Sequence, residues 1–268
     1  MKKRNLKHNS SGQVIIITAL LVASLLLSTA IYVLETEKEV PTADTGENNV
    51  FPAYQQSTIN TLISALASIT NGGKTSVLTD DLSELNAAIA NDSYQAMLQM
   101  SYTPLTVGPY LNGIWKSWGA DGVGVSSAYV SDGVGVSSAY VSFVFDSSAP
   151  STSSNLEYDV NVTTAAILSG YLQLNSNPTQ VNLTVNVLNE GKPALAQNFT
   201  FYFEGYSGSL LTENWEKVDS PIITDFGNGT YSVSFTTEMD QLNDPLPVSM
   251  LCQDQRGITV GANVTCTT

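Results

Sequence analysis

The sequence is poor in charged residues and especially poor in bases. Only 13% of its residues are charged, whereas soluble globular chains usually carry roughly 25%. Ten bases stand against 24 acids, and the resulting net charge of −14 excludes a nucleic-acid-binding protein with a basic face. Apolar residues still make up 43% of the 268 residues, which is enough for one or two domains with buried cores.

The chain also has little of the chemistry that enzymes use. Its one histidine is His8, and it has two cysteines. The remainder therefore offers no histidine for a catalytic triad, a Cys–His pair or a zinc site, and the cysteines are too few for a disulfide-dense scaffold. A Gly-x-Ser-x-Gly motif and the phosphate-binding motif Gly-x-x-x-x-Gly-Lys-Ser/Thr are both missing. We therefore expect a non-enzymatic protein with no catalytic residues, no cofactor and no metal site.

The first 34 residues have the pattern of a membrane anchor. Residues 14–34 run for 21 residues without a charge, and a helix of that length spans roughly 30 Å, the thickness of a bilayer core. Four bases lie within residues 1–13, and all 24 acids follow residue 34. The positive-inside rule then places the N-terminus in the cytoplasm and the C-terminal bulk outside the cell. We expect a cytoplasmic tail over 1–13, a single transmembrane helix over 14–34 with the lipid bilayer as its partner, and a linker over 35–52.

Two other interpretations of this segment remain open. A cleaved secretory signal has a shorter apolar region of roughly 7–15 residues, and Ser28-Thr29-Ala30 is its candidate cleavage site. The second interpretation starts from Gly12-Gln13, between a short basic leader and the apolar run. This arrangement resembles the prepilin-type signal of archaeal pilin-like proteins and the Gly-Gln opening of TadE/TadG-like pilus proteins. The resemblance implies processing between Gly12 and Gln13 and a pilin-like or pseudopilin subunit, although Ile17 stands where type IV pilins usually carry Glu.

Two amphipathic segments follow the linker. Apolar residues recur at spacings of three and four from Ile59 to Ile69, and Asn71-Gly72-Gly73 ends this pattern. Thr79-Asp80-Asp81 supplies an N-cap and first-turn acids for a second helix, whose apolar positions continue to about Met100. The two segments predict a helical hairpin over 53–105.

From Tyr110 the apolar period changes from about 3.6 to 2, which predicts a β meander over 106–177. The serine-rich segment 147–155 predicts a loop. The expected strands are Ile114–Trp118, Val123–Val130, Val134–Phe145, Leu156–Thr163 and Ile167–Leu174.

An eleven-residue repeat lies inside this meander. Residues 121–131 recur without change as 132–142. Two copies are too few for a solenoid, and an insertion at an exposed turn costs little. The two aspartates of the repeat also lack the spaced oxygen ligands of a calcium loop. We therefore interpret the repeat as a tolerated duplication rather than as a ligand-facing hairpin or a metal loop.

Residues 178–268 carry the pattern of an all-β sandwich, with short alternating strands separated by turns. Asn189-Glu-Gly-Lys-Pro193 and Asp225-Phe-Gly-Asn-Gly-Thr-Tyr231 resemble bacterial and archaeal immunoglobulin-like repeats of the invasin and filamin type. The resemblance implies that Tyr231 closes a corner between the two sheets.

Two kinds of covalent modification are expected outside the membrane. Cys252 and Cys266 lie on the last two strands and predict a disulfide, which needs a bulge or a curled chain end because the turn puts Cys252 opposite about residue 259. Six Asn-x-Ser/Thr triplets predict a glycosylated surface. They begin at Asn91, Asn161, Asn182, Asn198, Asn228 and Asn263.

These features predict a non-enzymatic, single-pass cell-surface glycoprotein of archaeal style with a structural or adhesive role. Self-association or contact with another surface protein would serve that role, and nucleic acid is not expected as a partner. One alternative is the pilin-like or pseudopilin subunit. The other is a secreted carbohydrate-binding module that uses Trp115 or Trp118 as an aromatic platform, whereas the more ordinary role for these rings is a core that joins the helices to the sheet.

Overall fold

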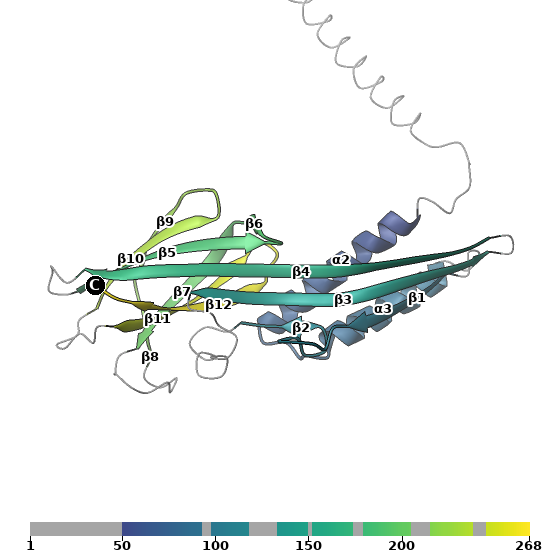
Figure 1. Ribbon diagram of the computed structural model, residues 1–268, viewed down its shortest axis with the longest axis horizontal. Helices are drawn as coiled ribbons and strands as arrows, with labels where there is room; N and C mark the ends of the chain where they lie inside the picture. The colour runs from purple at the N-terminus through teal and green to yellow at the C-terminus, as the bar shows by residue number, and fades with distance from the viewer. Residues whose placement is uncertain are drawn as a thin grey trace, which may run out of the picture. The chain divides into compact units, whose positions relative to one another are not determined.

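A computed structural model describes residues 50–92, 98–117, 133–149, 152–173, 179–204, 215–237 and 245–268. Within it, residues 51–268 form one compact unit of two helices followed by two antiparallel sheets (Figure 1). The predicted cytoplasmic tail, transmembrane helix and processing site, the first copy of the repeat and Trp118 lie outside the described residues. Among the residues described, no helix is both long enough and apolar enough to cross a membrane.

The two predicted helices are confirmed as α2 (Val50–Thr70) and α3 (Val77–Asp92). Leu62, Leu66 and Ile69 recur on one side of α2 and are fully buried, so the apolar stripe packs inward as its spacing indicates. Beyond the last turn of α2, Gly72 adopts a φ of 93°, which favours glycine and ends the helix.

The predicted continuation of the second helix to about Met100 is wrong. Residues Leu98–Pro104 form strand β1, in which Leu98 and Met100 are buried and alternate with exposed residues. β1 pairs along its whole length with β3 (Val134–Ala149), so the β3 backbone supplies hydrogen bonds that a helix would have made locally.

Within the predicted meander, β3 and β4 (Thr152–Gln173) form one long hairpin, and the strand expected at Ile114–Trp118 is the short strand β2 (Ile114–Trp115), which pairs with β3. The expected loop over 147–155 is wrong over most of its length, because the ladder continues to the Ala149–Thr152 pair. The two strands expected over 156–163 and 167–174 are one continuous strand. The polar residues near the hairpin end pair with one another across the strands, as when Asn155 Nδ2 donates to Asp146 Oδ1 at 2.9 Å.

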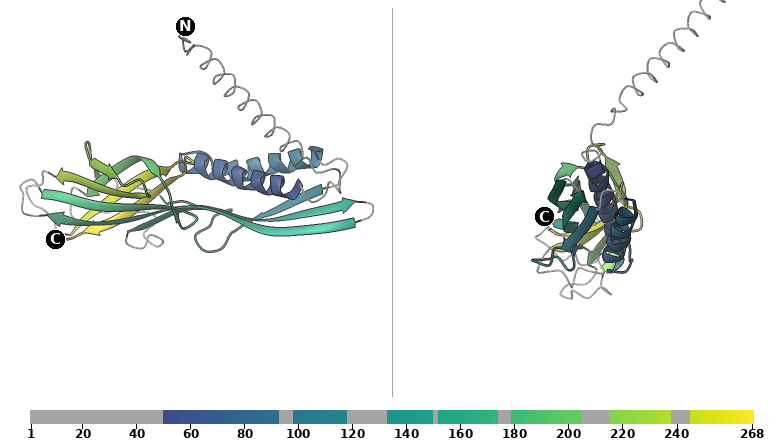
Figure 2. Two further views of the ribbon diagram at one scale, coloured as in Figure 1. Left: turned by 90° about the horizontal axis from the view of Figure 1, so that it is seen from above. Right: turned by 90° about the vertical axis from the view of Figure 1, so that its right-hand side faces the viewer.

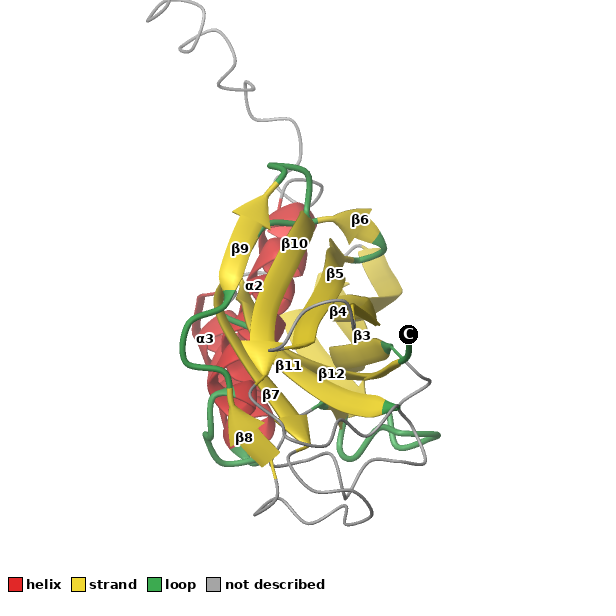
Figure 3. Cartoon of the chain, turned by 90° about the vertical axis from the view of Figure 1, so that its left-hand side faces the viewer, coloured by secondary structure: helices red, strands yellow, loops and turns green. Residues whose placement is uncertain are grey.

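The other strands complete two sheets. The order in the eight-stranded sheet is β1-β3-β4-β5-β10-β9, with β2 beside β3 and β6 beside β5, and the four-stranded sheet has the order β12-β11-β7-β8. Figure 3 looks onto the sandwich, with β9 and β8 at the outer edges of their sheets. The bounds are β2 Ile114–Trp115, β5 Thr179–Asn189, β6 Lys192–Pro193, β7 Ala196–Glu204, β8 Trp215–Lys217, β9 Ile222–Asp225, β10 Thr230–Thr237, β11 Leu246–Asp254 and β12 Thr259–Cys266.

Two hydrophobic cores lie along the long hairpin. At one end α2 and α3 cover one face of β1, β3 and β4 (Figure 2), and β4 contributes Val160 and Val162 to this core. At the other end the four-stranded sheet packs on the larger sheet, and β4 contributes Leu168 and Leu172. The sandwich therefore takes strands from both sides of residue 178, where the sequence predicts its first residue.

Tyr231 links the two sheets of the sandwich, as the sequence predicts. Its hydroxyl accepts a hydrogen bond from the Ala196 N–H at 2.7 Å and donates one to the Ala196 carbonyl at 3.2 Å. Tyr231 lies on β10 and Ala196 on β7, so one side chain joins the eight-stranded sheet to the four-stranded sheet.

Candidate functional site

β5 lies beside β4 along only the C-terminal part of the β4 strand. β3 pairs with it from Thr152 to Ile167, whereas β5 pairs with it only from Thr164 to Gln173. Among the described strands, none pairs with residues 152–163 on the β5 side. This half of β4 is therefore a free sheet edge.

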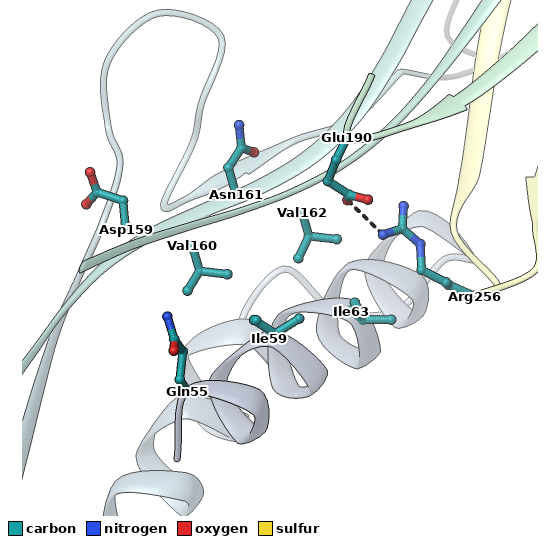
Figure 4. A pocket seen from close by; sticks show the side chains of 9 residues that line it. All are labelled: Gln55, Ile59, Ile63, Asp159, Val160, Asn161, Val162, Glu190 and Arg256. Atoms are coloured by element: carbon teal, nitrogen blue, oxygen red, sulfur yellow. Dashed lines mark hydrogen bonds and ion pairs between the residues drawn. The ribbon is translucent and has the colours of Figure 1, made fainter. Parts of the chain in front are cut away.

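A groove of about 450 Å³ runs along this free edge (Figure 4). Ile59 and Ile63 of α2 form one wall and are half-buried. Val160 and Val162 turn toward α2 and belong to its core, whereas Asp159 and Asn161 point away from the helix. The complete lining is Gln55, Ile59, Ile63, Asp159, Val160, Asn161, Val162, Glu190 and Arg256.

Glu190 and Arg256 close one end of the groove. Glu190 lies in the turn after β5 with a φ of 47°, and its N–H donates to the Thr163 carbonyl at 3.1 Å. The Thr163 N–H in turn donates to Glu190 Oε1 at 3.0 Å. Arg256 Nη1 donates to the same Oε1 at 2.7 Å, so the turn after β5 is tied to the turn between β11 and β12.

The buried carboxylate of Asp254 holds Arg256 in place. The Asp254 side chain is fully buried, and its Oδ2 accepts from Arg256 Nε and from Thr164 Oγ1, each at 2.8 Å. Its Oδ1 accepts from the N–H groups of Arg256 and Ile258, each at 2.9 Å. All four of these bonds lie within the junction formed by Glu190, Thr163, Thr164 and the turn at residues 254–258, which indicates a structural role.

The charge of Arg256 is held by its two acidic partners. Burial works against that charge, but the hydrogen bonds to Glu190 and Asp254 outweigh it and raise the pKa of the guanidinium above its usual value. Arg256 Nη2 also donates to the Thr163 carbonyl at 3.0 Å. The guanidinium is thus engaged on three sides by the protein itself.

The C-terminus of α2 is fixed to the same junction. Asn71 Nδ2 donates to the Gly257 carbonyl at 2.7 Å, and the Thr259 N–H donates to Thr70 Oγ1 at 3.1 Å. The helical wall of the groove and its closed end therefore share one anchor, the turn at residues 254–258.

A polar and aromatic cluster covers the other face of β3 and β4. Asp159 accepts from Ser142 Oγ at 2.6 Å and from the Tyr140 hydroxyl, and these two bonds lower the pKa of the Asp159 carboxyl. The same Tyr140–Asp159 contact raises the pKa of the Tyr140 hydroxyl. The rings of Tyr110 and Trp115 meet edge to face at 6.0 Å, and those of Tyr110 and Tyr140 at 6.1 Å.

The ordinary role expected for Trp115, a core that joins the helices to the sheet, is wrong. Trp115 pairs with Ser138, whereas Ile114 pairs with Ala139, and it is Ile114 and Ala139 that are buried against the helices. Because successive residues of a strand point to opposite faces, Trp115 lies on the face away from the helices. It is half-buried there.

The predicted disulfide between Cys252 and Cys266 is absent, and both thiols are free. Cys252 pairs with Val260 and Cys266 with Leu246 in an unbroken β11–β12 ladder. The bulge that the bond needs is missing from this ladder; a register shift occurs only between β11 and β7. Burial, with a smaller effect of Asp254, raises the pKa of the Cys252 thiol to about 12, and burial raises that of Cys266 to about 11.

The six predicted glycosylation sites differ in exposure. Asn91, Asn161, Asn198 and Asn228 are exposed. Asn182 is half-buried, and its Nδ2, the atom that a glycan would join, is buried without a hydrogen-bond partner. Asn263 is also half-buried, with a buried Oδ1. The geometry therefore favours the four exposed sites as glycan acceptors.

Sequence reasoning missed the free edges of the sheets. Besides the β4 edge, β9 is an outer strand, and Ile222 within it and Phe226 directly after it expose 70% and 59% of their surface. In the described part of the chain, no group of three or more His, Cys, Asp or Glu side chains is placed to hold a metal ion.

Comparisons of the chain with protein-family models, with curated proteins and with solved structures found no match.

Proposed function

We propose that this chain is a non-enzymatic cell-surface protein that is held in the membrane by residues 14–34 and displays residues 51–268 outside the cell for adhesion or assembly. The free β4 edge beside α2 supports this proposal best. Its groove offers backbone groups and apolar walls. Of its charged residues, Glu190 and Arg256 bind each other, and Asp159 accepts hydrogen bonds from Ser142 and Tyr140. Such a site suits binding better than bond making or breaking.

Labelling of intact cells tests the topology. A membrane-impermeant amine reagent should modify Lys74 and Lys192, which are exposed, and should leave Lys2 and Lys7 unmodified until the cells are opened. The reverse pattern, with the N-terminal lysines labelled first, would contradict the proposed orientation.

The mature N-terminus separates the alternatives. Mass spectrometry of protein from native membranes should find a start at or near Met1 for the plain anchor. A start at Gln13 would replace it with the pilin-like or pseudopilin subunit, and a start near Ile31 would indicate a secreted protein.

We also propose that the sandwich is immunoglobulin-like. The hydroxyl of Tyr231, which bonds across to Ala196, supports this, together with the two facing antiparallel sheets. The strand order in an experimental structure tests this proposal. A sandwich with a connectivity different from that of immunoglobulin domains would contradict it.

Carbohydrate binding is a second candidate function, and the aromatic cluster on the outer face favours it. Tyr110, Trp115 and Tyr140 lie half-buried near the carboxylate of Asp159, a combination that suits sugar rings and hydroxyls. A glycan array probed with the wild type and with Trp115→Ala tests it. Signals that disappear in the variant support this function, and an array without signals for the wild type counts against it.

A further inference from the structure

We propose that the groove beside β4 binds an extended peptide segment of a partner protein, which pairs with β4 as an additional strand. The segment would alternate apolar residues toward α2 with basic residues toward the outer face. This inference rests on the proposed binding function and names the chemistry of its partner.

The main-chain groups of β4 point into the groove at every second residue. Tyr140 lies opposite Asn161, yet the Tyr140 N–H donates to the Gly113 carbonyl at 2.8 Å and its carbonyl accepts from the Leu105 N–H at 3.1 Å. Tyr140 and Asn161 are therefore a non-hydrogen-bonded pair, and the N–H and carbonyl of Asn161 point away from β3.

Thr163 shows the same orientation two residues further along. Its N–H and its carbonyl both bond to Glu190 on the groove side. The two-residue period of a strand then gives Asp159 and Glu157 the orientation of Asn161. These three residues present donors and acceptors in the spacing of a ladder.

The two sides of the groove favour different side chains on the two faces of an added strand. Ile59 and Ile63 stand beside Val160 and Val162, so side chains on the helix side of an added strand would meet apolar surface. On the opposite face the added strand would lie beside the exposed carboxylates of Glu157 and Asp159. Lysine or arginine at alternate positions complements these charges.

The groove also fixes where the strand ends. Glu190 fills the ladder position at Thr163, so an added strand reaches Asn161 and stops at the turn after β5. Free edges of natural sheets are commonly protected by lysine, proline or a bulge. Residues 152–163 contain no lysine and no proline, and their pairing with β3 is regular. The only charges on residues 152–163 are the carboxylates of Glu157 and Asp159, which disfavour acidic strands and favour basic ones. An exposed sheet edge beside an apolar wall is the arrangement that peptide-binding sheets use.

Fluorescence polarisation with full-length protein in detergent micelles tests the proposal. The probe is a labelled six-residue peptide that alternates valine and lysine. One control peptide carries N-methyl groups on the amides that face β4, and a second has the same composition as a block of valines followed by a block of lysines. We expect each control to bind about tenfold more weakly or worse, because pairing or alternation is lost. Equal binding of the N-methylated peptide would overturn the proposal.

Two variants of one residue separate backbone pairing from side-chain contact. Asn161→Pro removes an N–H that faces the groove and leaves the β3 ladder bonds in place, so it should weaken binding about tenfold. Asn161→Ala keeps that N–H and should bind within about twofold of the wild type. Loss of binding in both variants alike would contradict the backbone role.

Hydrogen exchange on the wild type keeps the test independent of variant folding. The bound probe should slow exchange at the amides of Asn161 and Asp159. Binding without that protection would place the peptide elsewhere and overturn the proposal. Self-association of the protein that displaces the probe would identify a second copy as the occupant and would contradict a foreign partner. The labelling of intact cells tests the cell-surface role independently of peptide binding. If the lysines are labelled as expected but the peptide does not bind, the peptide site is overturned and the cell-surface role is not.

Discussion

Glu190 occupies the ladder position opposite Thr163 that a further residue of β5 would otherwise fill. It does so with its own N–H, which donates to the Thr163 carbonyl at 3.1 Å, and with its carboxylate, which accepts from the Thr163 N–H at 3.0 Å. The chain turns away from the sheet here, so β4 loses its second neighbour. The groove begins at this point.

The acceptor oxygen of Glu190 should contribute more to the stability of the fold than the charge of its carboxylate does. Glu190→Ala removes the partner of Thr163 and of Arg256, and we expect a loss of about 1 kcal/mol in the free energy of unfolding. The loss stays small because the Glu190 side chain is 46% exposed and solvent screens the ion pair. Glu190→Gln keeps an acceptor and should lose less in the same urea titration. Equal losses would assign the effect to the charge.

Substitution of Asp254 should lower the free energy of unfolding far more than substitution of an exposed aspartate. Asp254→Ala leaves the half-buried guanidinium of Arg256 and the buried N–H of Ile258 without their shared acceptor, so we expect a loss of about 3 kcal/mol. The matched control is Asp146→Ala, in which an exposed aspartate loses one bond to Asn155 and stability falls by no more than about 0.5 kcal/mol. Similar losses for the two variants would contradict the anchoring role of the Asp254 carboxylate.

The two cysteines should remain free and unreactive in the folded protein. Burial raises the thiol pKa values to about 12 for Cys252 and about 11 for Cys266, above the unfolded value of about 8.5. A raised thiol pKa contributes stability that is fully present below pH ~8.5 and is lost as the pH rises toward 11. A thiol reagent at pH 8 should label neither residue before unfolding and both residues after it. A non-reduced mass lower by two hydrogens would show a disulfide instead.

Deleting one copy of the eleven-residue repeat should leave the fold intact. Fifteen residues separate Ser117 from Gly133, and the deletion leaves four, a common length for a hairpin connection. Ser117 is held beside β3 and β12, since its N–H donates to Ser137 Oγ at 3.4 Å and its carbonyl accepts from the Gly261 N–H at 3.1 Å. The melting temperature should fall by no more than about 2 °C. A much larger fall would give the duplicated segment a structural role.

Local pattern predicted the helices and the alternating strands well, and it failed where distant pairing decides. The stripe from Leu62 to Ile69 has a helical period and needs no other information. Leu98 and Met100 have the two-residue spacing of a strand but directly follow a helical pattern, and pairing with β3, more than 40 residues away, makes them a strand. The composition of 147–155 indicates a loop, but Ser147 pairs with Ser154 and Ser148 with Ser153 in the backbone ladder of β3 and β4.

The candidate site had no local signal at all. Glu190 and Arg256 stand 66 residues apart in two turns, and the sequence of neither turn indicates contact with the other. The groove arises because β4 extends beyond the end of β5. The relative length of two strands depends on the pairing in the whole sheet. Nothing in the sequence around Asp254 marks its side chain as buried, although burial makes it the anchor of the turn at residues 254–258.

Hydrogen exchange at two amides gives the sharpest test of strand addition to β4. The full-length protein is compared with and without the peptide that alternates valine and lysine. A strand added to the free edge of β4 predicts slower exchange at Asn161 and Asp159. It also predicts no change at Val160, whose N–H faces β3. Unchanged exchange at Asn161 and Asp159 while the peptide is bound would contradict the account.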